Sequence, residues 1–138
     1  MDFIPYLGFN GNCREAFAFY AELLGGKIEA MLTHGEMPDA DQHVDEATRD
    51  KIMHAAMRVG DGLLFGGDAP GNFYQKPAGF MVTISLPEVS EGERVFNALA
   101  EGGEVQMPYA ETFWTERFGM VIDRFGTPWA INGGEARK

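Results

Sequence analysis

The sequence predicts an α+β domain in which two modules, at about 1–75 and 76–138, each follow the order strand, helix, then three strands. Three observations lead to this prediction. Each half opens with an apolar segment, continues with one amphipathic helix that ends at a Gly-Gly pair, and then alternates short strand candidates with turn residues. We expect the sheets of the two βαβββ modules to curve and to pack as one domain of 138 residues.

The first half begins with an apolar segment, FIPYLGF, followed by a helix signal. Asn12 has Glu15 three residues later, which is capping-box spacing, so Asn12 is predicted to cap the helix. The pair Gly25-Gly26 tolerates the left-handed backbone that commonly ends a helix. Between these signals the apolar residues recur at helical spacing, at Cys13, Ala16, Phe17, Tyr20, Leu23 and Leu24.

Three strand candidates complete the first half, and a long polar segment interrupts them. KIEAML comes first, and KIMHAAMRVG and LLFGGD follow on either side of a Gly-Asp-Gly turn. The polar segment 34–50 holds His34, Pro38, His43 and many acids, and its spacing matches no recognised metal-ligand motif. We interpret it as a solvated acidic loop, with metal ligation by the loop as the open alternative.

The second half repeats this plan. GFMVTISL is strand-like, Ser90 and Glu93 have capping-box spacing, and an apolar stripe then runs to Gly102-Gly103. EVQMPY, RFGMVID and TPWAING are three further strand candidates. The offset between matching glycines falls from 77 residues at the helix ends to 64 at the later turns, so the halves differ by a loop that is 13 residues longer around 34–50.

The chain is strongly acidic, with 21 Asp and Glu against 11 Lys and Arg and a net charge of −10. Such a surface repels phosphate backbones and anionic lipids, so we expect no nucleic acid and no membrane among its partners. No apolar run approaches the roughly 20 residues that span a bilayer, and MDFIPYLGF lacks the pattern of a signal peptide. We therefore expect a cytoplasmic protein. The single cysteine, Cys13, is interpreted as a core residue.

Three ordered blocks carry a resemblance to a known family. They are PYLGFNGNCREAFAFYAELLGG, HAAMRVGDGLLFGGD and FWTERFGMVIDRFGTPWAIN, and they extend over nearly the whole chain. They resemble the PhnB-like branch of the vicinal oxygen chelate superfamily, which includes glyoxalase I, extradiol dioxygenases, and the bleomycin and fosfomycin resistance proteins. The resemblance implies a glyoxalase-like fold of paired βαβββ modules around a cupped sheet, and a homodimer.

The resemblance also implies where a metal site would lie, and the residues there depart from it. Metal-using members place His, Gln or Glu on four strands that face the cup, because a Lewis-acidic ion needs several fixed donors. Here Ala130 stands where related enzymes carry a glutamate, and the strand expected to carry a histidine begins with Phe80, Met81 and Val82. The first strand offers only Pro5, Tyr6 and Leu7. We therefore predict no metal and no other cofactor.

The most unusual segment in composition is YAETFWTERFG. Aromatic rings and a guanidinium can hold a flat or anionic ligand by stacking and by bidentate hydrogen bonds, which makes Trp114 and Arg117 the leading ligand-binding candidates. Two structural alternatives stay open. Trp114 can instead fill the core or a dimer interface, and Arg117 can pair with Glu111 or Asp123.

Four further residues are candidates for lining the cup. His54 and Arg58 lie four positions apart on one strand and therefore share a face, which is either the cup or the solvent side. Thr83 and Ser85 alternate with apolar residues, so their hydroxyls lie on the face opposite the apolar one. Asp123 precedes a turn, where a turn-forming or ion-paired aspartate is favoured over a catalytic base.

Two function classes remain open at this stage. The favoured hypothesis is a metal-independent binder that encloses a small organic molecule in the cup, with an organic anion among the candidate ligands. The alternative is a lyase, isomerase or dioxygenase with a noncanonical site that uses His54, Arg58 or Asp123. Some members of the branch are described as demethylubiquinone methyltransferases, but the sequence shows no resemblance to an adenosylmethionine-binding motif, so we do not predict that activity.

Overall fold

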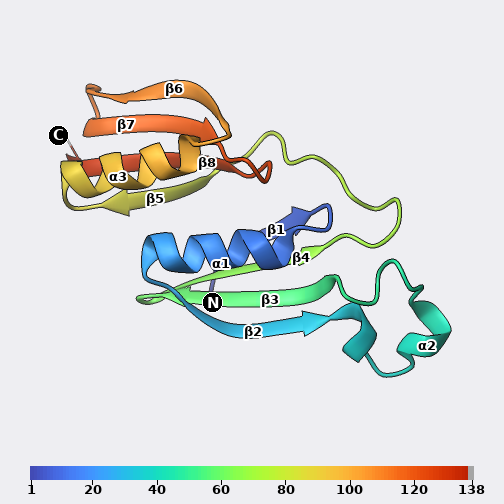
Figure 1. Cartoon of the computed structure of the whole chain (residues 1–138). Coiled ribbons are helices and arrows are strands. Elements are labelled where there is room, and N and C mark those ends of the chain that lie inside the picture. Colours follow the sequence, from blue (N-terminus) through green and yellow to red (C-terminus); the bar gives the residue numbers. More distant parts are fainter. Residues whose placement is uncertain (137–138) are drawn as a thin grey trace. The chain divides into compact units, whose positions relative to one another are not determined.

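The computed structural model of the chain describes residues 1–136, apart from the side chain of His43. The chain divides into two compact units, Met1–Lys76 and Pro77–Lys138. Each unit contains one long helix and one four-stranded mixed sheet (Figure 1), so the predicted α+β fold of two βαβββ modules is confirmed. The first unit contains β1 (Tyr6–Phe9), α1 (Cys13–Leu24), β2 (Lys27–Thr33), the 3-10 helix η1 (His34–Glu36), α2 (Ala40–His43), β3 (Ile52–Val59) and β4 (Gly62–Asp68). The second contains β5 (Val82–Leu86), α3 (Val89–Ala100), β6 (Glu104–Ala110), β7 (Thr115–Ile122) and β8 (Pro128–Ala136).

The two sheets share one topology. In the first, the strand order is β1-β4-β3-β2, with β1 parallel to β4 and the other neighbours antiparallel. The second has the order β5-β8-β7-β6, with β5 parallel to β8. The helix of each unit joins its first strand to its second, at the opposite edge of the sheet, and the third and fourth strands then return by antiparallel pairing, so that the fourth strand lies parallel to the first. The sequence repeat is thus also a structural repeat.

Each long helix packs on one face of its own sheet through a phenylalanine over a strand glycine. A Cβ atom at Gly66 would lie 2.7 Å from the ring of Phe17 in α1, and one at Gly119 would lie 2.6 Å from the ring of Phe96 in α3. Glycine is required at both positions because real Cβ atoms do not approach other atoms so closely. The close approach buries each helix against its sheet and leaves the other face of that sheet without a helix.

The N-terminus of α1 is not capped as the sequence predicted. Asn12 is the residue before the helix, but its side chain makes no capping hydrogen bond. The carboxylate of Asp68, at the end of β4, takes that role: its Oδ1 accepts hydrogen bonds from the backbone N–H groups of Gly11, at 2.9 Å, and Cys13, at 3.0 Å. A charged acceptor is a stronger partner for these N–H groups than a neutral amide. The capping-box prediction at Asn12 and Glu15 was therefore wrong.

The predicted capping box of the second helix is also wrong. Helix α3 begins at Val89, so Ser90 lies inside the helix instead of preceding it. The residue before the helix is Glu88, whose backbone is extended and whose carbonyl accepts the first helical hydrogen bond, from Gly92 at 3.1 Å. Because Pro87 fixes its own φ and suits extended chain or a helix start, the helix begins two residues earlier than the Ser-x-x-Glu pattern suggested.

The segment between β2 and β3 is more ordered than a solvated loop. The N–H of His34 donates to the carbonyl of Lys51 and that of Gly35 to the carbonyl of Arg49, both at 2.9 Å, so the pairing of the two strands continues into the segment. His34 is consequently buried, with 7% of its surface exposed. The expectation of a solvated position was wrong for this residue, whereas the side chain of His43 lies outside the described part of the structure.

A second buried carboxylate organises the turn before β8. Asp123 Oδ1 accepts hydrogen bonds from the N–H groups of Phe125, at 2.9 Å, and Thr127, at 3.0 Å. Its Oδ2 accepts from the indole Nε1 of Trp129 at 2.8 Å. Trp129 is almost fully buried, so this bond satisfies its one polar atom inside the core. The interpretation of Asp123 as a turn-forming residue is confirmed.

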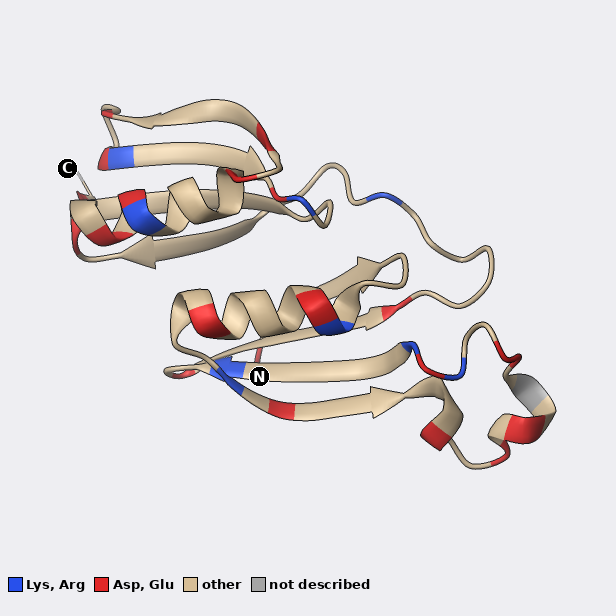
Figure 2. Ribbon diagram, in the orientation of Figure 1, with Lys and Arg blue, Asp and Glu red and all other residues tan. Residues whose placement is uncertain are grey.

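Acidic residues lie in both long helices and in the segment between β2 and β3 (Figure 2), and basic residues are fewer in the sequence. Within residues 1–136, no helix combines the length and the apolar character that crossing a bilayer requires.

We predict that Asp68→Asn strongly destabilises the protein. Besides capping α1, Asp68 accepts a hydrogen bond from the N–H of Ile52 through Oδ2 at 2.8 Å. In the asparagine variant an NH2 group replaces one carboxylate oxygen, so a backbone N–H would meet a second donor and lose its hydrogen bond. We expect the free energy of unfolding to fall by about 2–4 kcal/mol, measured by urea denaturation. Asp61→Asn, an exposed position in the turn between β3 and β4, is the matched control and should cost little. Equal losses in the two variants would contradict the structural role of Asp68.

Candidate functional site

The helix-free face of the first sheet is the best-formed aromatic surface of its unit. Strand alternation places Ala55 and Met57 of β3 on the side of α1, so their neighbours in β3 lie on the other side. The register then assigns the remaining strands: Tyr6 pairs with Phe65, and Leu32 pairs with His54. The side chains that define this face are Tyr6, Leu32, His54, Arg58, Leu63 and Phe65.

Three rings meet at the centre of this face. The imidazole of His54 stacks on Tyr6 at 6.3 Å between ring centroids and meets Phe65 edge-on at 5.0 Å. Tyr6 is 53% exposed, and His54 and Phe65 are half-buried, so the cluster is reachable from outside its own unit's core. An imidazole between two rings offers a polar group within an apolar surface, which suits a ligand with a flat apolar part and one hydrogen-bonding group.

A glycine positions the Tyr6 ring. The hydroxyl of Tyr6 donates to the carbonyl of Met53 at 3.1 Å, across the position of Gly67 in β4. A Cβ at Gly67 would lie 2.6 Å from that hydroxyl oxygen and would displace the ring. Partial burial raises the pKa of Tyr6, and electrostatic effects of Cys13 and Asp68 add to the rise, so the hydroxyl remains a donor at neutral pH.

Arg58, which pairs with Lys27 across β2 and β3 on the same face, already forms an ion pair. Arg58 Nε donates to Glu29 Oε2 at 3.0 Å, and both side chains are more than a third exposed. Arg58 therefore lies on the same face as His54, as the sequence predicted from their spacing, but its guanidinium is partly neutralised by Glu29. The remaining N–H groups of the guanidinium stay available to a ligand.

The helix-free face of the second sheet carries the predicted hydroxyls. Thr83 and Ser85 in β5 pair with Ala130 and Asn132 in β8, and both hydroxyl residues are exposed. Asn132 Nδ2 donates to Ser85 Oγ at 3.2 Å, while the buried Oδ1 of Asn132 accepts no hydrogen bond within the described residues. The side chains that define this face are Thr83, Ser85, Met107, Phe118, Met120 and Asn132.

Trp114 lies beside this second face. Its indole meets Phe118 edge-on at 5.3 Å and Phe113 at 5.0 Å, and it is 39% exposed. A hydrogen-bonded turn between Thr112 and Thr115 holds the backbone on either side of it. In the part of the structure described, Trp114 thus lies on the surface of its unit and does not fill the unit's core.

The structure separates Arg117 from Trp114, in contrast to the predicted site that combined them. Arg117 pairs with Gly133 on the side of the sheet where Tyr109 stacks on Phe96 of α3. Burial raises the pKa of Tyr109 and the nearby Arg117 cation opposes that rise, which agrees with this placement. Arg117 also lies 3.9 Å from Glu111, one of the partners considered from the sequence. The indole of Trp114 and the guanidinium of Arg117 therefore do not form one ligand site.

The donor set at the expected metal position does not fit a metal. Ala130 lies on the helix-free face of the second sheet, between Thr83 of β5 and Met120 of β7, and none of the three supplies a carboxylate or an imidazole. Within the part of the chain that the structure describes, no three His, Cys, Asp or Glu side chains gather in a way that could hold a metal ion. The residues at this position are small, hydroxylic or apolar, and their side chains supply none of the charged or imidazole ligands that hold a metal tightly.

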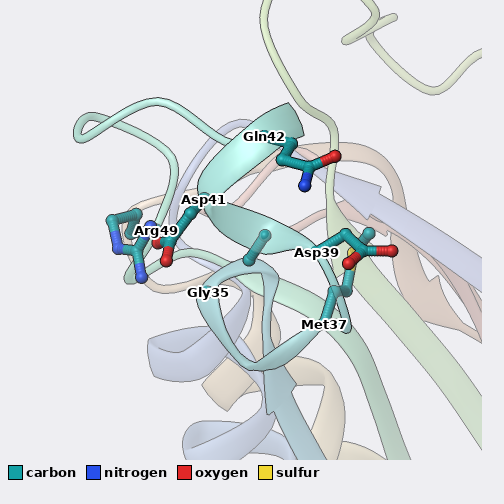
Figure 3. A pocket seen from close by; sticks show the side chains of 7 residues that line it. Gly35, Met37, Asp39, Asp41, Gln42 and Arg49 are labelled. Atoms are coloured by element: carbon teal, nitrogen blue, oxygen red, sulfur yellow. Dashed lines mark hydrogen bonds and ion pairs between the residues drawn. The ribbon is translucent and has the colours of Figure 1, made fainter.

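A further pocket, of about 330 Å³, lies in the segment between β2 and β3 (Figure 3). Arg49 and Asp41 form an ion pair at 2.9 Å on one side of it, and Met37 and Asp39 lie on the other. Asp39 has a left-handed backbone, with φ of 63°, which aspartate tolerates. The Asp41 carboxylate is 90% exposed, so the pair is held in water and contributes little. This pocket is therefore a weaker candidate than the helix-free faces.

Comparison with known proteins identifies the family. A family model described as 3-demethylubiquinone-9 3-methyltransferase matches residues 1–132. The chain belongs to this PhnB-like family of the vicinal oxygen chelate superfamily. Protein YjdN of Escherichia coli K12 is 36% identical over 139 residues, which cover 96% of this chain and 95% of YjdN.

Solved structures agree with this membership. Protein PA1353 of Pseudomonas aeruginosa is 46% identical, with a TM-score of 0.89 over 97% of this chain and 98% of PA1353. The fosfomycin resistance protein FosX of Listeria monocytogenes is 10% identical, with a TM-score of 0.65 over 98% of this chain and 93% of FosX, and shows the shared fold alone.

Sequence reasoning did not assign ligand-binding roles to two members of the ring cluster. Tyr6 entered the analysis only as a residue that cannot bind a metal, and Phe65 was part of a strand candidate without a role. Strand alternation shows which residues of one strand share a face, but the register between β1, β3 and β4 decides which residues of different strands meet. That register is a long-range property that no local pattern in the sequence displays.

We predict that the thiol of Cys13 weakens the protein at alkaline pH. Burial raises the pKa of Cys13 from 9.0 to about 12, with Asp68 adding to the rise, so above pH 9 the unfolded chain loses a proton that the native protein keeps. The free energy of unfolding should therefore fall above pH 9, by about 2 kcal/mol at pH 10.5. Denaturation of the protein and of Cys13→Ala at pH 8 and pH 10.5 measures this difference. Identical pH dependence in both proteins would show that the thiol is not shielded.

Proposed function

We propose that this PhnB-like protein binds a small organic molecule without a metal, on the helix-free faces of its sheets. The observation that carries the proposal is the cluster of Tyr6, His54 and Phe65, in which three partly exposed rings meet on a face that no helix of the unit covers. Such a surface stabilises a flat apolar ligand by contact area and by ring geometry, and His54 adds a hydrogen bond that orients it.

The charges of the face narrow the ligand class. Arg58 and its cross-strand partner Lys27 are cations of this face. Glu29 occupies one donor of Arg58, so a carboxylate on the ligand would share the guanidinium with Glu29. An aromatic carboxylate therefore satisfies both the rings and the cation. On the second sheet, Trp114 offers a further ring, and Thr83 and Ser85 offer neutral hydrogen bonds.

The alternative of a noncanonical enzyme has less support. It was based on His54, Arg58 and Asp123, but Asp123 is occupied by two backbone N–H groups and the indole of Trp129. Arg58 is paired with Glu29. An acid–base mechanism would then depend on His54 alone, whose described neighbours are aromatic rings rather than a group that would orient a catalytic imidazole.

We predict that aromatic carboxylates bind the first helix-free face. A fragment set of aromatic carboxylates, titrated into ¹⁵N-labelled protein, should shift the amides of β1, β3 and β4. For a bound fragment, Tyr6→Ala and His54→Ala should each weaken the affinity about five- to tenfold, because each removes one side of the ring cluster.

Two variants serve as controls for this experiment. Tyr74→Ala removes a half-buried ring outside both sheets and should leave the affinity unchanged. Arg117→Ala removes the cation on the helix-bearing face of the second sheet and should also have no effect. If Trp114→Ala or Arg117→Ala abolishes binding while Tyr6→Ala and His54→Ala do not, the site lies in the second unit and the proposal for the first face is wrong.

We also predict that the protein is a homodimer. Strands β2 and β6 are sheet edges, and they expose the apolar side chains of Leu32, Val105 and Met107, each at least 40% exposed. Uncovered edges with apolar side chains favour association with a second copy. Light scattering coupled to gel filtration at micromolar concentration should give about twice the chain mass of 15.2 kDa. A mass of one chain under these conditions would contradict this prediction.

A further inference from the structure

A second pocket lies beside the segment that makes the first half longer than the second. It has a volume of about 330 Å³ and is formed by the segment between β2 and β3 together with the chain after β4. None of its lining residues belongs to the helix-free face of the first sheet. The lining includes His34, Met37, Val44, Asp45, Thr48 and Phe73.

The imidazole of His34 is fixed in one tautomer. Its Nε2 lies 3.0 Å from the backbone carbonyl oxygen of Asp68, and because a carbonyl only accepts hydrogen bonds, Nε2 must carry the hydrogen. In the neutral ring, Nδ1 then holds a lone pair. Within the described residues no group donates to Nδ1, although the side chain is only 7% exposed. A largely buried imidazole whose second nitrogen is bonded to none of the described residues, on the wall of a pocket, can receive a donor from a ligand.

The nearest charge in the pocket is also an acceptor. Asp45 Oδ1 accepts the N–H of Thr48 at 2.9 Å, which fixes the carboxylate, and its Oδ2 has no partner within the described residues. No Lys or Arg lines this pocket, in contrast to the pocket of Figure 3, where Arg49 pairs with Asp41. Two acceptors without a neighbouring cation favour a ligand that is positively charged and rich in N–H donors, such as an ammonium group.

The rest of the wall is apolar. Phe73 is 80% exposed and is held at the pocket by a turn in which its N–H donates to the carbonyl of Pro70 at 3.1 Å. Met37 and Val44 add aliphatic surface. An exposed ring beside acceptors stabilises a cation through its π-face and an apolar substituent through contact area. The net charge of −10 raises the local concentration of such cations.

We infer that this pocket is a second ligand site, separate from the helix-free faces, and that it binds a small primary amine in its ammonium form with an apolar or aromatic substituent. The ammonium group donates to Nδ1 of His34 and to the carboxylate of Asp45, and the substituent packs on Phe73. This site does not depend on the proposed function of the first sheet, because the two share no residue.

Benzylamine is the probe that tests the inference. Titrated into ¹⁵N-labelled protein at pH 7.5, it should shift the amides of His34, Thr48 and Phe73 and leave those of Tyr6 and Phe65 in place. Benzyl alcohol, which has the same ring without the charge, should bind at least tenfold more weakly, and benzoate should not bind the pocket. Equal shifts from benzylamine and benzyl alcohol would overturn the assignment of an ammonium site.

Two conservative variants separate the site from the fold. His34→Gln keeps a side-chain N–H that can donate to the Asp68 carbonyl but replaces the ring acceptor Nδ1 with an amide oxygen at a different position. Asp45→Asn keeps an oxygen for the Thr48 N–H but removes the charge. Each should weaken benzylamine binding about tenfold.

Glu46→Gln is the matched control for charge. It removes the same charge at the next residue, which is exposed and does not line the pocket, and it should change the affinity less than twofold. A loss in Glu46→Gln equal to that in Asp45→Asn would mean that benzylamine is attracted by the acidic surface alone, and the inference would be wrong. If His34→Gln fails to fold, Asp45→Asn still decides the question, because its turn contact is retained.

Discussion

The carboxylate of Asp68 is the interaction on which the first unit depends. It lies at the end of β4 and accepts three backbone N–H groups, from the loop before α1, from Cys13 in the first turn of α1, and from Ile52 at the start of β3. Removing a charge from water is costly, and a carboxylate offsets this cost only when its oxygens are hydrogen-bonded by fixed donors. The three donors lie 16 to 57 residues away along the chain, so one side chain brings helix, strand and loop into register. The second unit uses the same chemistry at Asp123, on a turn and on the indole of Trp129.

This constraint determines which surfaces remain for function. Each helix packs on one face of its sheet, with Phe17 over Gly66 and Phe96 over Gly119. Because side chains alternate along a strand, every second side chain lies on the opposite face, which the helix does not cover. In a protein with a stability of only several kcal/mol, aromatic rings left on such a face are not explained by the packing of their own unit. Under the proposed function these rings contact a ligand, and the predicted homodimer would add a second copy of the chain as a partner.

The fold could be predicted because its signals are local, whereas the site could not. Helical spacing from Cys13 to Leu24 and the glycines that follow are features of neighbouring residues, and the structure confirms both. The cap of α1 comes from Asp68, 55 residues after Cys13, so the nearby Asn12 was assigned in its place. The relation of Arg117 to Trp114 depends on an irregularity in the pairing of β7 with β8 between Thr115 and Arg117, which no pattern in the sequence reveals.

In the extra segment between β2 and β3, the position and the tautomer of His34 are set by hydrogen bonds to residues of the sheet. Its backbone begins as a continuation of the strand pair, through His34 and Lys51, so the first residue of the segment is placed by the sheet rather than by the loop. Asp68 then supplies its own carbonyl to Nε2 of His34, with the same residue's carboxylate committed to the helix and to β3. The tautomer of this imidazole is thus set by the most constrained residue of the unit. A group oriented in this way loses little conformational freedom when a ligand binds, which is the property that separates a preorganised site from an acidic loop.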